Sequence, residues 1–393
     1  MELLKYISIL LAISSCSTSN VEVDEAVDTG EAKVEASGEA KAKKSATDVE
    51  KILVALNPVE PQAVFNWQGY FKTPPTSKDR SQIESLVKTL ESAKSEDDLL
   101  KRARNETALG RYASAEASYR EVLRKNRNNM EAMIEMAGLY HKIRNQKLAM
   151  QVLTDVKDML AGLEQPDKKL IFRYRYIQAV VLIQNGDRES GHSILSELIG
   201  QEKTFVPGYA ALASSYLSTG KYQIAKFIVE RALDRGAEDP SLYNLLGVTY
   251  ERQRSFIQAR EYYNKAIAQN DAFAPALVNR ANIYLKTKEY RLAETDLKKA
   301  IEVDPLNVDA MISLAVVLRQ TGRSSLAKNH LSRVLDIVPD SAEARFNLAI
   351  VMRDNEKNSS EAIRLFSEVA QTDKASSELK MMAKSAMDAI KNF

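Results

Sequence analysis

Residues 281–305 read ANIYLKTKEYRLAETDLKKAIEVDP, with small side chains at Ala281, Ala293 and Ala300. Apolar and small residues recur every three or four positions on both sides of the polar segment 286–289, which is typical of two amphipathic helices joined by a short turn. The distance between two packed helices depends on the side chains at their contact, so small residues there allow a close approach. The stretch therefore predicts a tightly packed helical hairpin.

The same spacing extends over most of the chain. A small residue equivalent to Ala281 recurs at intervals of 34 residues, with a single interval of 42 that contains an eight-residue insertion around Gly162 to Lys169. A unit of 34 residues suits two helices of three to four turns with short connections. The equivalent positions are Ala103, Ala137, Ala179, Ala213, Gly247, Ala281, Ala315 and Ala349.

Two more sets of residues keep the same phase. Twelve positions after each of these residues stands another small one: Ala115, Ala149, Gly191, Ala225, Ala259, Ala293, Ala327 and, one residue late, Ala362. Seven positions further stands a small or aliphatic residue: Val122, Val156, Leu198, Ala232, Ala266, Ala300, Val334 and, again one late, Val369. Because each pair leaves an apolar face uncovered, we expect these positions to be buried by stacking of successive pairs.

This pattern resembles the tetratricopeptide repeat over residues 96–370. The unit quoted above carries the signature most fully, at Ala281, Tyr284, Tyr290, Ala293, Ala300 and Pro305. No unit has the signature Trp at its fourth position, and the terminal proline occurs only as Pro305 and Pro339. The resemblance implies an all-α, right-handed superhelical solenoid of about eight helix-turn-helix repeats that binds other proteins. Residues 371–393, with apolar residues at helical spacing, are predicted to form a C-terminal capping helix.

The N-terminus reads MELLKYISILLAISSC, with an apolar core that is too short to span a bilayer. Its length and flanks predict a signal peptide over residues 1–15. Ile13-Ser14-Ser15-Cys16 resembles the bacterial lipobox, which implies cleavage before Cys16 and lipidation of this residue. The alternative is a plain signal peptide with an incidental cysteine. In enteric-type bacteria Asp after the lipidated cysteine favours the inner membrane, so Ser17 favours a periplasm-facing anchor in the outer membrane.

Residues 16–50 follow as the lipidated cysteine and a tether. Nine acidic residues and four lysines give residues 17–50 a net charge of −5, and no aromatic residue is present. Such a composition predicts a disordered spacer. Residues 51–95 contain an aromatic segment, which either packs over the first helices or forms an exposed epitope, followed by the predicted capping box Ser81-Gln82-Ile83-Glu84 that would begin a helix. The aromatic residues are Phe65, Trp67, Tyr70 and Phe71.

Several classes of function are disfavoured. The net charge of +2, from 55 basic and 53 acidic residues, does not resemble a nucleic-acid binder. The single cysteine excludes an intrachain disulfide and a cysteine zinc site, and His141, His192 and His330 lie in different units. The chain has no HExxH, phosphate loop, dinucleotide fingerprint or nucleophile elbow. We therefore expect no catalysis, cofactor, metal or small-molecule substrate.

In the family that the pattern resembles, the first helix of each pair lines a concave groove. The resemblance implies a groove for an extended peptide, whose backbone the side-chain amides can pair with and whose carboxylates the basic groups can hold. The polar candidates are Asn244, Arg252, Asn279, Asn282, Lys286, Ser313, Arg319, Gln320, Asn347 and Arg353. The apolar candidates are Val248, Val278, Ile312, Val316, Phe346 and Ile350. Alternatively, the asparagines serve only helix solubility.

These expectations combine into an envelope-anchored scaffold for protein–protein interactions. The lipobox-like end and the repeats resemble lipoproteins of pilus, gliding-motility or secretion machines, whose components such a scaffold would assemble. The spaced Lys/Asn/Lys/Arg set of the chaperone-binding carboxylate clamp is missing. Two alternatives are a periplasmic chaperone or carrier for exported polypeptides and an adaptor of peptidoglycan enzymes. An envelope enzyme would need polar groups clustered in one pocket, which the sequence does not indicate.

Overall fold

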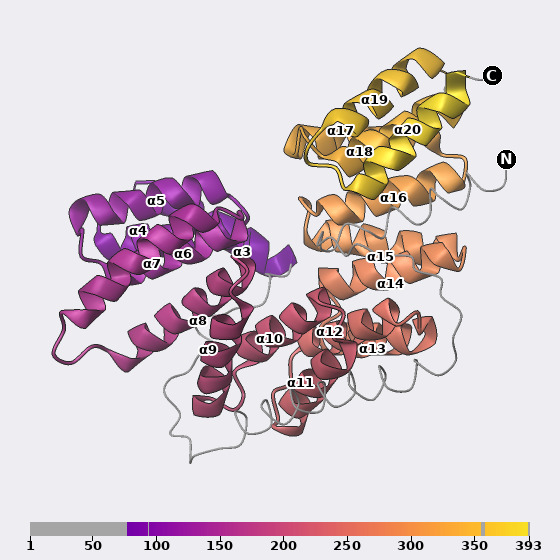
Figure 1. Ribbon diagram of the computed structural model, residues 1–393. Helices are drawn as coiled ribbons and strands as arrows, with labels where there is room; N and C mark the ends of the chain where they lie inside the picture. The colour runs from indigo at the N-terminus through magenta and orange to yellow at the C-terminus, as the bar shows by residue number, and fades with distance from the viewer. Residues whose placement is uncertain (1–76, 93, 355–357, 392–393) are drawn as a thin grey trace, which may run out of the picture. The chain divides into compact units, whose positions relative to one another are not determined.

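The computed structural model describes residues 77–92, 94–354 and 358–391 (Figure 1). Within these ranges the chain forms 18 α-helices and no β-strand, which confirms the all-α class. Cys16, the tether and the aromatic segment lie outside the described residues. None of the described helices is both long enough and apolar enough to cross a membrane.

The chain divides into two compact units, whose boundary falls between Thr249 and Tyr250 inside α12 (Pro240–Arg252). The N-terminal unit contains the helices α3 (Ser77–Thr89), α4 (Glu96–Ala108), α5 (Tyr112–Lys125), α6 (Met130–Lys142), α7 (Gln146–Ala161), α8 (Lys168–Gln184), α9 (Arg188–Gln201), α10 (Val206–Ser218) and α11 (Tyr222–Asp234). The C-terminal unit contains α13 (Phe256–Gln269), α14 (Ala274–Lys286), α15 (Tyr290–Val303), α16 (Val308–Gln320), α17 (Ser324–Ile337), α18 (Ala342–Asp354), α19 (Ser359–Gln371) and α20 (Ser377–Lys391).

The helices from α4 to α19 follow one another as helix-turn-helix pairs, as the repeat predicts. Every residue of the first set of small positions is buried, and its seven alanines are at most 1% exposed. The third set, from Val122 to Val369, is 0% exposed throughout. Close helix crossings at these positions therefore form the apolar seam of the solenoid in both units.

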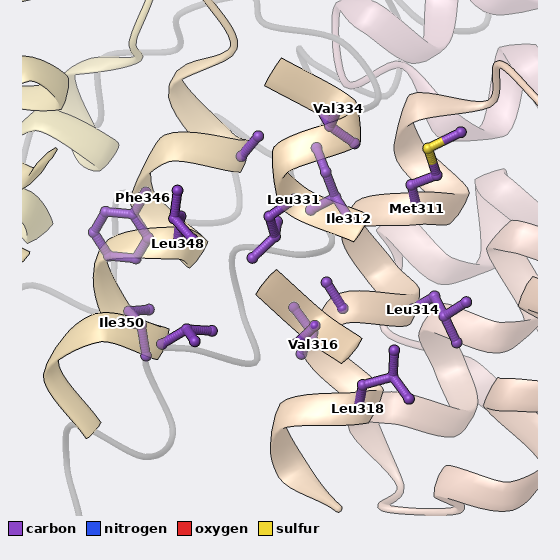
Figure 2. Packing of buried hydrophobic residues seen from close by; sticks show 14 of the residues in the cluster. Met311, Ile312, Leu314, Val316, Leu318, Leu331, Val334, Phe346, Leu348 and Ile350 are labelled. Carbon is purple, nitrogen blue, oxygen red and sulfur yellow. The ribbon is translucent and has the colours of Figure 1, made fainter. Parts of the chain in front are cut away.

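In the C-terminal unit, α16 is the most enclosed helix. Nine consecutive residues, Ala310 to Leu318, are buried, which is more than two full turns and hence every face of the helix. Figure 2 shows Met311, Leu314 and Leu318 on this helix and, to one side, Phe346 and Ile350 on α18. A helix that is apolar all round is stable only inside a packed core.

The C-terminal unit ends with the predicted cap. In α20, Leu379, Ala383 and Ala386 are at most 4% exposed and belong to the same apolar cluster as Phe366 of α19. Packing of α20 against α19 covers the apolar face that the last pair would otherwise leave open.

Two local predictions need correction. The capping box at Ser81 is wrong, because α3 begins at Ser77 and Ser81 lies inside it. The Ser-x-x-Glu spacing also fits two residues one turn apart within a helix, so it does not by itself mark a helix start. The insertion near Pro166 is mostly helical, since α7 and α8 have 16 and 17 residues whereas the preceding α6 has 13.

The turn inside each pair uses a left-handed residue. Gly110, Gly186, Gly220 and Gly322 have φ between 72° and 100°, and at the equivalent position Arg144, Arg254 and Lys288 have φ between 58° and 63°. A side chain with a Cβ is strained in this region, whereas glycine is not.

We expect Arg144→Gly to raise the free energy of unfolding by roughly 0.5 kcal/mol, because the relieved strain outweighs the entropy cost of glycine. Urea unfolding of the N-terminal unit, followed by amide exchange in α6 and α7, measures the change. The matched control is Gly110→Ala, which introduces the same strain at φ 76° and should lower stability. A lower stability of Arg144→Gly would show that this turn position carries no strain.

Candidate functional site

The predicted groove residues fall on the first helices of the last four pairs. Asn244 lies in the N-terminal unit and is half-buried, whereas the other eight committed polar candidates lie in the C-terminal unit. On α12, α14, α16 and α18 they take matching places in successive pairs. Arg252 is exposed, and Asn279 and Gln320 are half-buried.

The apolar candidates are enclosed. Ile312, Val316, Phe346 and Ile350 are at most 4% exposed, and Val278 is 7% exposed (Figure 2). Val248 is half-buried. The aliphatic and aromatic residues at these positions thus belong to the packed interior of the C-terminal unit, and a peptide would reach them only at the ends of the helices.

Asn282 is committed to an internal hydrogen bond. Its side-chain Oδ1 accepts a hydrogen bond of 2.9 Å from the Ser313 hydroxyl of α16, and the two residues are 8% and 1% exposed. Asn347 is 3% exposed, and its Nδ2 donates to the Glu343 carbonyl one turn earlier at 2.9 Å. These amides join or stay within the helices, so their availability to a peptide backbone is smaller than the sequence suggests.

Lys286 is neutralised within the C-terminal unit. Its ammonium lies 2.7 Å from Glu251 Oε1 and 4.8 Å from the centre of the Phe256 ring. The other Glu251 oxygen accepts a hydrogen bond of 2.7 Å from the Tyr263 hydroxyl. The pair is mostly shielded from water, with side chains 19% and 15% exposed, so it fixes α14 against the end of α12.

Arg319 and Arg353 meet Asp354 at the carboxyl end of α18. Arg353 Nε lies 2.5 Å from Asp354 Oδ1, while Arg319 Nη1 lies 3.8 Å from Asp354 Oδ2. Burial lowers the pKa of Arg319, and the charge of Asp354 opposes this shift. The structure therefore brings two of the predicted basic residues together around one carboxylate.

A charged cluster in the N-terminal unit escaped the sequence analysis. Glu131 and Glu135 of α6 lie between Arg104 of α4 and Arg173 of α8, and Arg173 is 6% exposed. Glu135 also accepts a hydrogen bond from the Tyr119 hydroxyl at 3.3 Å. Because Glu131 and Arg173 stand at equivalent positions of adjacent repeats, opposite charges at matching positions are the signal that could have identified the cluster.

The histidines stay apart, on α6, α9 and α17. His192 Nε2 lies 2.7 Å from the Ser215 hydroxyl, and burial lowers the pKa of His192 to about 4. Burial likewise lowers the pKa of His141 and of His330. Among the described residues, no group of His, Cys, Asp or Glu is arranged to hold a metal ion.

The comparisons with known proteins identify the class of the repeats. Models of the tetratricopeptide repeat match residues 100–162, 210–275 and 274–307. Tetratricopeptide repeats form protein–protein interaction scaffolds, generally without catalytic activity, and this is the class of protein that the repeats define here. The absence of an active site remains a prediction from sequence.

Two solved structures share the fold at low sequence identity. The Cut9–Hcn1 hetero-tetramer of the APC/C matches with a TM-score of 0.53 and 15% identity over 80% of this chain and 60% of that chain. Yeast Tom70 matches with a TM-score of 0.51 and 16% identity over 93% of this chain and 75% of that chain. No curated protein sequence matches the chain.

Proposed function

We propose that this protein is an envelope-anchored scaffold that holds together components of a multiprotein machine of the pilus, gliding-motility or secretion type. The observation that carries the proposal is the combination of a lipobox-like Ile13–Cys16 with a tetratricopeptide array in one chain. The lipid would fix the protein to the outer membrane, the tether would span the gap, and the repeats would bind protein partners.

The internal pairing of the first helices supports a scaffold over a transient carrier. Asn282–Ser313 and Lys286–Glu251 connect successive helices of the C-terminal unit through short, shielded contacts. A preorganised surface loses little conformational freedom on binding, which favours a fixed partner. A chaperone or carrier for many polypeptides is better served by a surface that repacks.

Anchoring is tested by Cys16→Ala in the full-length chain. We expect the variant to leave the membrane fraction and to incorporate no labelled palmitate, because the thioether and the acylated amino group are both lost. The matched control is Ser17→Ala, which keeps the cysteine and should remain in the membrane. Membrane retention of an unlabelled Cys16→Ala protein would contradict the lipid anchor.

Partner binding is tested by crosslinking in membranes followed by mass spectrometry. A scaffold should return one partner at constant stoichiometry, whereas a chaperone should return many polypeptides at low occupancy. We expect joint replacement of Asn279, Asn282 and Arg319 by alanine to abolish recovery of that partner, with the helical circular dichroism unchanged.

The control variant is Ser313→Ala. It removes the internal hydrogen bond to Asn282 but leaves the candidate groove side chains in place. The partner should therefore be recovered with this variant. Full recovery with the triple variant would place the partner elsewhere on the protein.

A further inference from the structure

Arg319 has an unusual place near the carboxyl end of α16. Its side chain is only 9% exposed, and both Nε and Nη2 are buried without a hydrogen-bond partner. Its salt bridge to Asp354 involves the other terminal nitrogen, Nη1, at 3.8 Å. A buried guanidinium that makes no hydrogen bond along one edge is costly, and such a group calls for a specific explanation.

The unpaired edge is the one that arginine presents to carboxylates elsewhere in this chain. Arg280 donates from Nε and Nη2 to the two oxygens of Asp296, both at 2.7 Å. Arg104 uses the same two nitrogens toward Glu135, at 2.9 and 2.8 Å. This bidentate arrangement matches the fork of a guanidinium to a carboxylate. On Arg319 the equivalent edge has no such carboxylate.

The local charge is not balanced by Asp354. This carboxylate also accepts hydrogen bonds from Arg353 Nε at 2.5 Å and Arg353 Nη2 at 3.1 Å. Two guanidinium groups therefore share one carboxylate, which is 36% exposed, and the cluster keeps a net charge of +1. Arginine stays protonated even when it is buried. One further carboxylate would neutralise the cluster.

The surroundings favour a carboxylate attached to an apolar segment. Val316 lies one turn before Arg319 on α16, and Ile350 lies one turn before Asp354 on α18 (Figure 2). Both are buried, at 1% and 3% exposure, and they occupy equivalent positions of successive repeats. Away from water, a charge-assisted hydrogen bond is stronger than on an open surface.

We propose that Arg319 is the anchor for an aspartate or glutamate side chain of a partner polypeptide, held bidentately by Nε and Nη2. The proposal rests on the scaffold function above and assigns a chemistry to its partner: a carboxylate next to an aliphatic residue. The ligand enters from the side of Asp354, which Arg353 retains while the ligand carboxylate takes the free edge of Arg319.

The test uses ¹⁵N NMR of the arginine Nε–H groups in the full chain, with isovalerate as the probe. Isovalerate joins a carboxylate to a branched aliphatic group, and isovaleramide is its neutral isostere. Arg319→Gln assigns the Arg319 resonance by its disappearance. We expect isovalerate to shift this resonance saturably, with a Kd on the order of 1–10 mM for so small a ligand.

Controls decide the interpretation. The Arg280 Nε–H, already paired with Asp296, should not move, and isovaleramide should shift neither resonance. An unmoved Arg319 resonance, or an equal shift with isovaleramide or inorganic phosphate, would overturn the assignment to a carboxylate. If isovalerate fails while crosslinking still recovers a stoichiometric partner, the anchor is refuted and the scaffold function stands.

Discussion

Replacing Arg173 with methionine is expected to lower the free energy of unfolding of the N-terminal unit by about 3 kcal/mol, because it leaves two carboxylates short of a buried cationic partner. Arg173 lies 2.5 Å from Glu131 and also pairs with Glu135, and its side chain is 7% exposed. Methionine keeps much of the aliphatic volume, so the loss reports mainly on charge. Glu131 and Glu135 would then share Arg104 alone.

Amide hydrogen exchange in α6 and α8 measures this effect, because the cluster joins these two helices across the insertion. The matched control is Arg175→Met on the same helix. Arg175 pairs with Glu197 at 2.6 Å, but the two side chains are 29% and 51% exposed. Such a solvated pair is worth less than about 1 kcal/mol. Equal losses in the two variants would show that burial of the Arg173 cluster adds nothing.

Gly191→Ala is expected to destabilise the α8–α9 pair by about 2 kcal/mol, because the added methyl group overpacks a close helix crossing. A Cβ on Gly191 would lie 2.5 Å from Ile183 Cγ1 and 2.7 Å from the Ala179 carbonyl oxygen. The side chain of Ile183 can rotate, but a backbone oxygen moves only with its helix. This steric cost exceeds the gain of about 1 kcal/mol that alanine brings to a helix interior.

Gly138→Ala is the control for helix propensity. A Cβ at Gly138 would meet only the Ile177 side chain, at 3.2 Å from its Cδ1 atom. This flexible end can yield, so the variant should be neutral or more stable than the parent. Thermal unfolding monitored by circular dichroism compares the two variants. A stable Gly191→Ala protein would mean that α8 and α9 can separate at no cost.

The fold was predictable because its determinants recur. Residues such as Ala103 and Ala281 are required by the same steric contact in every pair, so a fixed spacing reveals them, and the structure buries all of them. The insertion was detectable as a change in spacing, but its helical character was not, because Pro166 suggests a loop and only one unit carries it. A single copy offers no repetition from which its conformation can be inferred.

The candidate site was less predictable, because it depends on which side chains pair between helices. Spacing places Asn282 and Arg319 on the first helices of their pairs, yet it does not tell that Asn282 bonds to Ser313. Nor does it tell that one edge of Arg319 remains unpaired. These outcomes depend on rotamers and on local crowding, which vary from unit to unit even where the backbone repeats.

The lengthening of α7 and α8 has a geometric consequence for this flank of the N-terminal unit. The 17 residues of α8 exceed the 13 of α6 by four, which at ~1.5 Å per residue is an overhang of about 6 Å. Leu163, in the connection between the two long helices, is 44% exposed at the end of this hairpin. A macromolecule that approaches from that direction meets a blunt finger with an oily tip before it meets the rows of shorter helices.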